Sequence, residues 1–348
     1  MLISHDQLRK FTADICEAAG ATEADARQVA DHLVEANLKG HDSHGVGMLP
    51  AYVRNARLGH LQPRAHARTH SEQGSILVVD GQFGFGQVVG PEAMDAGIAK
   101  ARETGLAVVA LRNAHHLGRI GSHAEHVAQA GLISMHYVNV VGHEPLVSPF
   151  GGVETRLGTN PFCCAIPVKD SHPIVLDMAT SAIAAGKIRV ARNSGKLVPE
   201  GCLIDHEGNE TRDPAVLSAT PKGSQTHFGK HKGFGLAFIC EVLAGSLAGG
   251  WSAQPGHPRE GTIVNHMLSF ILDPQQIADA DQYQQELRAL IDYMHSTPTA
   301  SGVDSVLIPG EPELQTRAER MAQGIEIDTT SWNQICEAAA SLNVSAPG

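Results

Sequence analysis

One segment of the chain brings together residue types that could transfer a proton: residues 40–52, with the sequence GHDSHGVGMLPAY. Ser43 and His44 stand where a loop is expected to meet a helix, with Ser43 as the cap and His44 at the helix start. The positive end of a helix disfavours imidazolium and so lowers the pKa of a histidine there. Such an imidazole, in a cleft, can transfer a proton to a carbonyl oxygen. The alternative is that these residues only cap the helix and form its loop.

A second candidate segment is NAHHLGRIG at residues 113–121, which directly follows a predicted strand. Loops in this position often carry functional residues. His115 and His116 are adjacent, so their side chains diverge and only one of them can face a shared site. Arg119 stands between two glycines that let the backbone approach a ligand, and its forked guanidinium is suited to bind a carboxylate or a phosphate.

A metal site is a weaker hypothesis, although the chain has 20 histidines. His123 and His126 follow the second segment, but no third ligand stands at a firm zinc-site spacing. The 6 cysteines include no C-x-x-C pair, and four of them lie in apolar sequence typical of small core residues. We therefore predict no metal site, and the cytoplasm as the default compartment.

The glycine-rich segment DGQFGFGQVVG, at residues 80–90, loosely resembles the fingerprint of a dinucleotide-binding loop. Its glycines at 84, 86 and 90 are spaced one residue too far apart for the common form. They also precede the helix that we expect from Pro91 to Glu103. We interpret the segment as a glycine-rich turn that reverses the chain rather than as a phosphate-binding loop.

Several later loops could bind an anion. The segment LDMATS, which contains Asp177, is expected to end a strand and begin a helix, whose free amides suit a phosphate or a ribose. His231 and Lys232 open a long predicted helix that ends near Ala248, and Glu311 starts another helix after a predicted strand. Each of these could instead be an ordinary helix start with a chance charged residue.

Composition narrows the class of protein. The chain has 348 residues, enough for one large or two ordinary domains, and no targeting peptide is apparent at its start. Its 26 basic and 37 acidic residues give a net charge of −11, which argues against nucleic acid or a membrane surface as a partner. No apolar run approaches the roughly 20 residues that span a bilayer.

The elements that must position the candidate residues alternate through the middle of the chain. Helices are predicted over most of the first 60 residues, one of them capped by Thr22. Strands are predicted at 75–80, 106–111, 132–141, 163–168, 174–177, 202–205 and 267–272. Helices return at about 276–295, 312–323 and 330–341. We predict an α/β protein with a helical shell, residues 1–120 plus 275–348, around a strand-rich centre, residues 121–274.

Taken together, these segments resemble the type 2 malate/L-lactate dehydrogenase family, and most closely its hydroxycarboxylate dehydrogenase branch. The blocks that carry the resemblance occur in the family's order and spacing over nearly the whole chain. They are DSHG at 42–45, His116-x-Gly118, GTNP at 158–161, DMATS at 177–181, HKG at 231–233 and PGE at 309–311.

The resemblance implies a non-Rossmann, sulfolactate dehydrogenase-like α/β fold and a homodimer. It implies hydride transfer between NAD or NADP and a 2-oxo acid, with the centre, residues 121–274, binding the cofactor and the shell binding substrate and forming the dimer. His44 matches a proton donor of some relatives, and His116 a proton acceptor of others. The cofactor contacts that it implies are His44, Gly118, Arg119, Ile120, Asp177, Met178, Ala179, His231, Lys232, Asn265, Pro309, Gly310 and Glu311.

One departure from the family concerns substrate binding. Many relatives have arginine where this chain has Met48, and that arginine would bind the substrate carboxylate. Met48 is flexible and apolar, so the pocket could admit a bulkier substrate. We hypothesise that Arg119, or else Arg54, binds the carboxylate instead. Ser43 and Asn160 complete the predicted substrate contacts.

Other functions stay open at this point. The same residues would fit reduction of a cyclic 2-imino acid, and they do not separate NAD from NADP. The histidine count leaves a metal-dependent hydrolase or lyase as a second class of function, and a non-catalytic binding module is a third.

Overall fold

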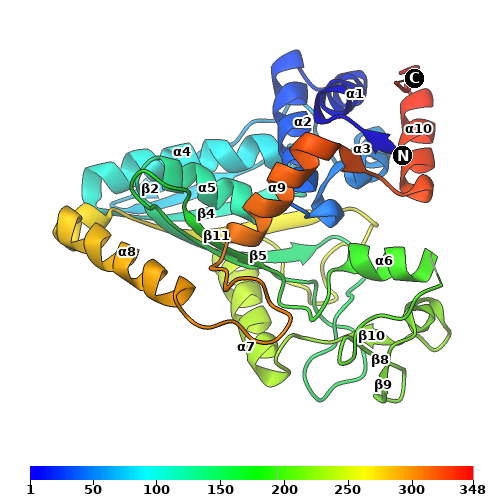
Figure 1. The fold of residues 1–348 in the computed structure, drawn as a ribbon. Helices are drawn as coiled ribbons and strands as arrows, with labels where there is room; N and C mark the ends of the chain where they lie inside the picture. The colour runs from blue at the N-terminus through cyan, green and yellow to red at the C-terminus, as the bar shows by residue number, and fades with distance from the viewer. Residues whose placement is uncertain (194, 348) are drawn as a thin grey trace.

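The computed structural model describes residues 1–193 and 195–347 (Figure 1). Its helices are α1 (His5–Ala18), α2 (Glu23–Leu38), α3 (Leu49–Leu58), α4 (Gly86–Thr104), α5 (Ile120–Gln129), α6 (Ala185–Asn193), α7 (His231–Cys240), α8 (Ala280–His295), α9 (Glu311–Gln323) and α10 (Thr329–Ala340). A π-helix, Glu241–Leu247, continues α7. Short 3-10 turns lie at Asp42–His44, Val46–Met48, Pro214–Ser218 and Pro274–Gln276.

A seven-stranded mixed sheet forms the centre of the molecule, in the order β2-β3-β4-β11-β5-β6-β7. Its strands are β2 (Arg68–Gln73), β3 (Ile76–Asp80), β4 (Leu106–His115), β5 (Ile133–Val141), β6 (Phe162–Ile166), β7 (Ile174–Met178) and β11 (Val264–Leu272). Only β3 and β4 pair in parallel, as a β-α-β unit with α4 as the crossover. The smaller strands are β1 (Leu2–Ile3), β8 (Leu203–Ile204), β9 (Glu210–Thr211), β10 (Ser224–Gln225) and β12 (Ile325–Glu326).

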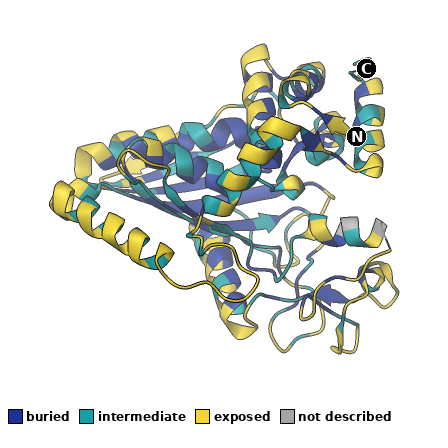
Figure 2. Ribbon diagram, viewed as in Figure 1, coloured by how far each residue is buried: buried dark blue, intermediate teal, exposed yellow. Residues whose placement is uncertain are grey.

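Helices cover both faces of this sheet (Figures 1 and 2). On one face, α4 and α5 pack through fully buried residues such as Met94 and Val127 against Val109 and Met267. On the other face, the π-helix packs on β4, β5 and β11. Alternate strand residues therefore face two apolar layers, as in other α/β proteins.

A second core joins the two ends of the chain. α1, α2 and α3 pack together with α10, and β1 pairs with β12, so that the N- and C-terminal segments lie side by side (Figure 1). Leu8, Ile15 and Leu33 are fully buried there, and burial of each contributes about 1.5–3 kcal/mol. Thr22 caps α2 by accepting the Asp25 N–H, as predicted.

The α/β class is confirmed, and the sheet constrains the predicted division of the chain. β3 and β4 belong to the predicted shell, whereas β5, β6, β7 and β11 belong to the predicted centre, yet all are strands of one sheet. A boundary at residue 120 would therefore divide this sheet between β4 and β11. The separate functions predicted for the shell and the centre remain proposals. Within the described residues, no helix combines the length and the apolar character needed to cross a membrane.

The predicted start of α4 was wrong. The helix begins at Gly86 rather than at Pro91, so the second half of the glycine-rich segment is helical and does not reverse the chain. The glycines serve close packing instead: a Cβ at Gly86 would lie 2.3 Å from the His116 carbonyl oxygen, and one at Gly90 would lie 2.5 Å from the His123 ring.

Four other features differ from the predictions. β4 continues beyond Leu111 to His115. The predicted strand ended too early because the residues at a bulge in the pairing of β4 with β11 break the apolar alternation that marks a strand. No helix begins at the DMATS segment, since α6 starts at Ala185, and no strand precedes Gly310. His44 lies in a 3-10 turn and not at a helix start.

Candidate active site

A cleft of about 1200 Å³ lies between the turns at residues 39–48 and the segment at residues 181–202 that contains α6. The predicted site residues that line it are Ser43, His44, Met48, His116, Gly118, Ile120, Asp177, Ala179 and Asn265. The other predicted site residues do not line it, although all are described: Arg54, Arg119, Asn160, Met178, His231, Lys232, Pro309, Gly310 and Glu311. The structure thus brings nine of the predicted residues, from four separate segments, to one place.

His44 and His116 are direct partners at this cleft. Nδ1 of His44 lies 3.2 Å from Nε2 of His116, and the two rings stack with their centroids 5.4 Å apart. Tyr52 Oη lies 2.7 Å from the other ring nitrogen of His116. A hydrogen-bonded pair of imidazoles that lines a cleft is suited to proton transfer.

Burial keeps both imidazoles neutral. It lowers the pKa of His44 to about 4, despite the opposing effect of Asp177. Burial, and then the neighbouring His44, lower the pKa of His116. The predicted direction for His44 is confirmed, but its cause is desolvation and not the helix dipole, because no α-helix starts at this residue.

The turn that carries His44 is fixed from behind by Asn37 of α2. Asn37 Oδ1 accepts the Val46 N–H at 2.9 Å, and Asn37 Nδ2 donates to Asp42 Oδ1 at 2.6 Å. Gly45 is required at the same place, since a Cβ there would lie 2.2 Å from Asn37 Oδ1. These contacts explain why the turn has the sequence DSHG.

The turn that carries His116 is held by β11. Asn265 Oδ1 accepts the Leu117 N–H at 2.9 Å, while Asn265 Nδ2 donates to the Asn139 carbonyl. Gly118 follows with a φ of +76°, and a Cβ there would lie 2.3 Å from His32 Nε2. The bulge lies in β4 just before this turn, where Arg112 and Asn113 stand opposite the single residue His266 of β11.

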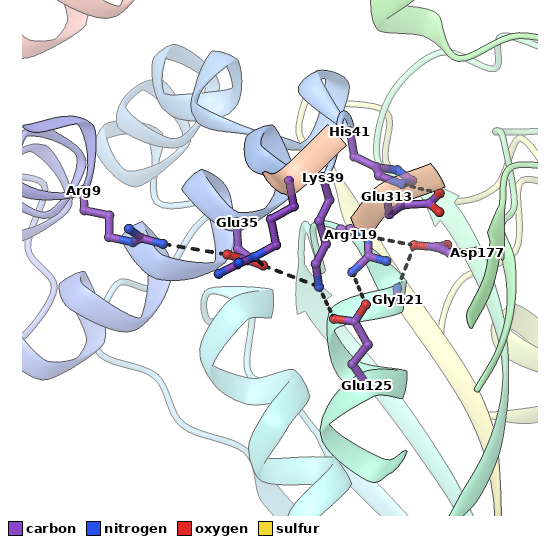
Figure 3. Close-up of polar contacts among 10 residues, drawn as sticks. Arg9, Glu35, Lys39, His41, Arg119, Gly121, Glu125, Asp177 and Glu313 are labelled. Atoms are coloured by element: carbon purple, nitrogen blue, oxygen red, sulfur yellow. Dashed lines mark hydrogen bonds and ion pairs between the residues drawn. The ribbon is translucent and has the colours of Figure 1, made fainter. Parts of the chain in front are cut away.

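Arg119 is held in buried ion pairs with Glu125 and Asp177 (Figure 3). Its side chain is 1% exposed, and its Nη1 donates to Glu125 at 3.0 Å. Its Nε lies 3.8 Å from Asp177 Oδ2, which also accepts the Gly121 N–H at 2.7 Å. Burial alone would lower the pKa of Arg119, but the two carboxylates outweigh it and raise the pKa. The guanidinium therefore anchors Asp177 and α5, and these contacts favour a structural role over the predicted binding of a substrate carboxylate.

Asn160 is also a structural residue. It is fully buried, and its Nδ2 donates to Glu241 Oε2 at 2.7 Å and to the Ala237 carbonyl at 3.2 Å. Its Oδ1 accepts the Val140 N–H at 3.2 Å. Because both ends of the amide are used within the protein, Asn160 ties the loop at 158–161 to α7, and this geometry favours a structural role over the predicted substrate contact. Arg54 donates to the Gly261 carbonyl at 2.9 Å, outside the cleft.

Other predicted cofactor residues lie around the cleft or near its edge. His231 and Lys232 open α7 and are exposed, as predicted for an anion-binding helix start. Gly310 caps α9, and Glu311 Oε2 accepts the Ile308 N–H and pairs with His295. No three His, Cys, Asp or Glu side chains of the described residues gather as the ligands of a metal ion would.

Several site residues were missed by sequence reasoning. His227 and Lys230 line the cleft, and the buried Nε2 of His227 has no partner there among the described residues. Tyr52 and Gln87 support His116 from inside the protein. Tyr52 closes the segment 40–52 in a chain with only 4 tyrosines, which was the available signal; Gln87 has no such signal.

Comparisons with known proteins agree with this arrangement. The family model for malate/L-lactate dehydrogenase matches residues 3–336. Hydroxycarboxylate dehydrogenase B of Escherichia coli is 46% identical over 97% of this chain and 93% of its own, and L-lactate dehydrogenase of Cupriavidus necator is 40% identical over 100% and 99%. The solved sulfolactate dehydrogenase of Methanocaldococcus jannaschii has a TM-score of 0.86 and 33% identity, covering 99% of this chain and 98% of that one. The chain therefore belongs to the malate/L-lactate dehydrogenase family.

Proposed function

We propose that this chain interconverts a 2-oxo acid and a 2-hydroxy acid with NAD or NADP bound in the cleft beside His44 and His116. Malate and L-lactate, for which the family is named, are both 2-hydroxy acids, and this supports the reaction class. The observation that carries the proposal is a neutral histidine at the cleft, His44, whose Nδ1 is held by His116 so that Nε2 is left for a substrate oxygen.

The cleft fits a nicotinamide dinucleotide together with a small acid. Its volume of about 1200 Å³ exceeds the roughly 300–1000 Å³ typical of pockets for a single small ligand. Asp177 and the unpartnered His227 Nε2 can accept hydrogen bonds from hydroxyl or amide groups, while Lys187 and Lys230 bring positive charge. When bound, the cofactor supplies or accepts the hydride.

The residues of the chain would orient the substrate and handle its proton. A neutral imidazole can polarise a carbonyl and then protonate the developing alkoxide. Asp177, fixed by Arg119 and the Gly121 N–H, faces the same cleft and lies close enough to favour positive charge on His44. Met48 and Ile263 give the cleft apolar lining, which suits a substrate with a bulky side chain. The predicted contact of Arg54 with the substrate carboxylate would require its side chain to leave the Gly261 carbonyl and reach the cleft.

The test is a screen for turnover. Purified protein is mixed with NADH or NADPH and a panel of 2-oxo acids and cyclic 2-imino acids, and the absorbance of the reduced nicotinamide is followed. We expect turnover of at least one 2-oxo acid, and its loss in His44→Ala. A protein that oxidises neither cofactor with any 2-oxo acid would contradict the proposal, and turnover of the imino acids alone would replace it.

We also propose a homodimer in the cytoplasm. Apolar side chains are exposed on α7 and the π-helix that follows it, namely Phe238, Ile239, Val242 and Leu247. Exposed apolar surface of this kind commonly marks a subunit interface. All 6 cysteines are unpaired, which suits a reducing compartment. Light scattering during gel filtration should give twice the mass of the chain, and one chain mass would contradict the dimer.

A further inference from the structure

A chain of hydrogen bonds runs from the interior of the protein to the cleft. Gln87 Nε2 lies 2.8 Å from Tyr52 Oη, Tyr52 Oη lies 2.7 Å from His116 Nδ1, and His116 Nε2 lies 3.2 Å from His44 Nδ1. Gln87, Tyr52 and His116 are buried. We call these four residues the relay. Only its last member, His44, has a ring nitrogen with no partner among the described residues, namely Nε2.

The orientation of the Gln87 amide sets the direction of the relay. Gln87 Nε2 also donates to the His116 carbonyl oxygen, at 3.1 Å. The opposite orientation of the amide would place two oxygens against each other at this distance, so the nitrogen is the atom that faces both groups. Tyr52 Oη therefore accepts a hydrogen bond from Gln87 Nε2, and its own O–H must point at His116 Nδ1.

The direction then passes along the two imidazoles. A neutral imidazole carries one N–H and one acceptor nitrogen. Because His116 Nδ1 accepts from Tyr52, the proton of His116 is on Nε2 and is donated to His44 Nδ1. His44 Nδ1 is therefore an acceptor as well, and the proton of His44 is on Nε2.

We propose that Tyr52 and Gln87 are positioning residues that fix the tautomer of His44, so that it presents an N–H and not a lone pair to the substrate. This inference rests on the proposed function, since it assigns a use to the nitrogen that faces the cleft. In the reductive direction, Nε2–H would donate to the carbonyl oxygen, and its proton would pass to the alkoxide formed at C2. His44 would then be an imidazolate, whose negative charge is stabilised by the hydrogen bond from His116 Nε2 to its Nδ1, until Nε2 takes up one proton from solvent.

The local sequence explains how Gln87 is held. Pro91 lacks an N–H, so it cannot make the helical hydrogen bond to the Gln87 carbonyl four residues earlier. Gln28 Nε2 of α2 donates to that carbonyl instead, at 2.8 Å. Gly86 lets the first turn of α4 lie directly against the His116 backbone. The glycine-rich segment thus positions the amide that sets the relay.

Two aromatic side chains, Phe85 and His115, lie close to the relay, and neither changes the direction of its hydrogen bonds. The Tyr52 ring contacts Phe85 and His115 edge-on, and neither contact competes for the Tyr52 hydroxyl. His115 has its own partner, since its Nε2 lies 3.0 Å from Asn55 Nδ2. Gln87 Oε1 is buried with no partner among the described residues, so the amide gives up an acceptor contact in order to keep its nitrogen on Tyr52 and His116.

The experiment reads the tautomer directly. Full-length protein labelled with ¹⁵N-histidine is examined by two-bond ¹H–¹⁵N correlation, which distinguishes protonated from bare ring nitrogens, and His44→Gln identifies the signals of His44. We expect His44 to carry its proton on Nε2 in the wild type. In Tyr52→Phe, which keeps the ring and removes the hydroxyl, we expect a mixture of tautomers and a kcat lower by about tenfold to a hundredfold, with little change in KM.

Tyr137→Phe on β5 is the matched control, because it makes the same change in a tyrosine whose ring contacts Phe162 and Phe270, away from the relay. It should leave the His44 signals and kcat unchanged. A wild-type proton on Nδ1 of His44, or an unchanged spectrum in a folded Tyr52→Phe, would overturn the proposal. If Tyr52→Phe does not fold, the wild-type spectrum still decides. The spectrum needs no substrate, so a failed turnover screen would overturn the proposed function without changing this reading.

Discussion

His44 Nδ1 and His116 Nε2 lie 3.2 Å apart, so the two histidines that could each donate the proton form one hydrogen-bonded pair. Only His44 has a ring nitrogen left for the cleft, because Tyr52 engages the other nitrogen of His116. The proposed function therefore assigns the two histidines an order, in which His44 acts on the substrate and His116 acts on His44.

This order predicts unequal effects of removing each histidine. His44→Gln should lower kcat by about a hundredfold or more, since it removes the group that contacts the substrate oxygen. His116→Gln should have a smaller effect, because the imidazole of His44 remains. His126→Gln is the matched control, as His126 is exposed on α5 and pairs only with Asp95. Steady-state kinetics of the three variants check this, and a larger loss in His116→Gln than in His44→Gln would reverse the assignment.

The buried neutral histidines predict that stability falls in mild acid. Burial lowers the pKa to about 4 in His44 and to about 3 in His136, whose ring nitrogens contact Ser269 and Ser134. The unfolded chain, with histidine pKa values near 6.5, binds more protons below that pH, so protonation favours unfolding. At pH 5 each such histidine costs up to about 2 kcal/mol relative to pH 7.

Urea unfolding at pH 7 and pH 5 measures this effect. The free energy of unfolding should fall as the pH falls from 6.5 towards 4, and His136→Gln should make that fall smaller. A free energy of unfolding that is the same at pH 7 and pH 5 would contradict the burial of neutral imidazoles. His70→Gln on the exposed strand β2 is the control, and it should leave the slope unchanged.

The sequence predicts those features that depend on neighbouring residues. The Thr22 cap follows from local residue types, and so does the start of α7 at His231. The role of Arg119 could not be predicted, because one of its partners, Asp177, is 58 positions away and its burial depends on the packing of whole helices. The same holds for Gln87, whose role depends on contacts with α3 and β4. Long-range contacts decided these cases, and a single sequence does not reveal them.

The buried ion pairs of Arg119 predict that removing its side chain lowers the stability of the protein. The hypothesis drawn from the sequence predicts instead that this change weakens substrate binding. Arg119→Met leaves Glu125 and Asp177 without their shared cation, and removing one partner of a buried ion pair costs about 3–5 kcal/mol. The midpoint of urea unfolding should fall sharply. Adding Glu125→Gln to the same chain should recover part of the loss. Arg156→Met, which removes an exposed pair with Glu154, should change stability by less than about 1 kcal/mol. A stable Arg119→Met with only a raised KM would restore the original hypothesis.

Met48 lines the cleft, at the position where the family resemblance leads us to expect an arginine. Met48→Arg would place a cation beside the substrate, and an arginine fork pairs with carboxylates through two hydrogen bonds. We expect a lower KM for small 2-oxo acids and a higher KM for those with bulky apolar side chains, because the apolar lining is lost. Met48→Leu is the control, since it keeps the apolar lining and adds no charge. Kinetics with one small and one bulky 2-oxo acid check the prediction, and equal changes for both substrates would show that residue 48 does not select between them.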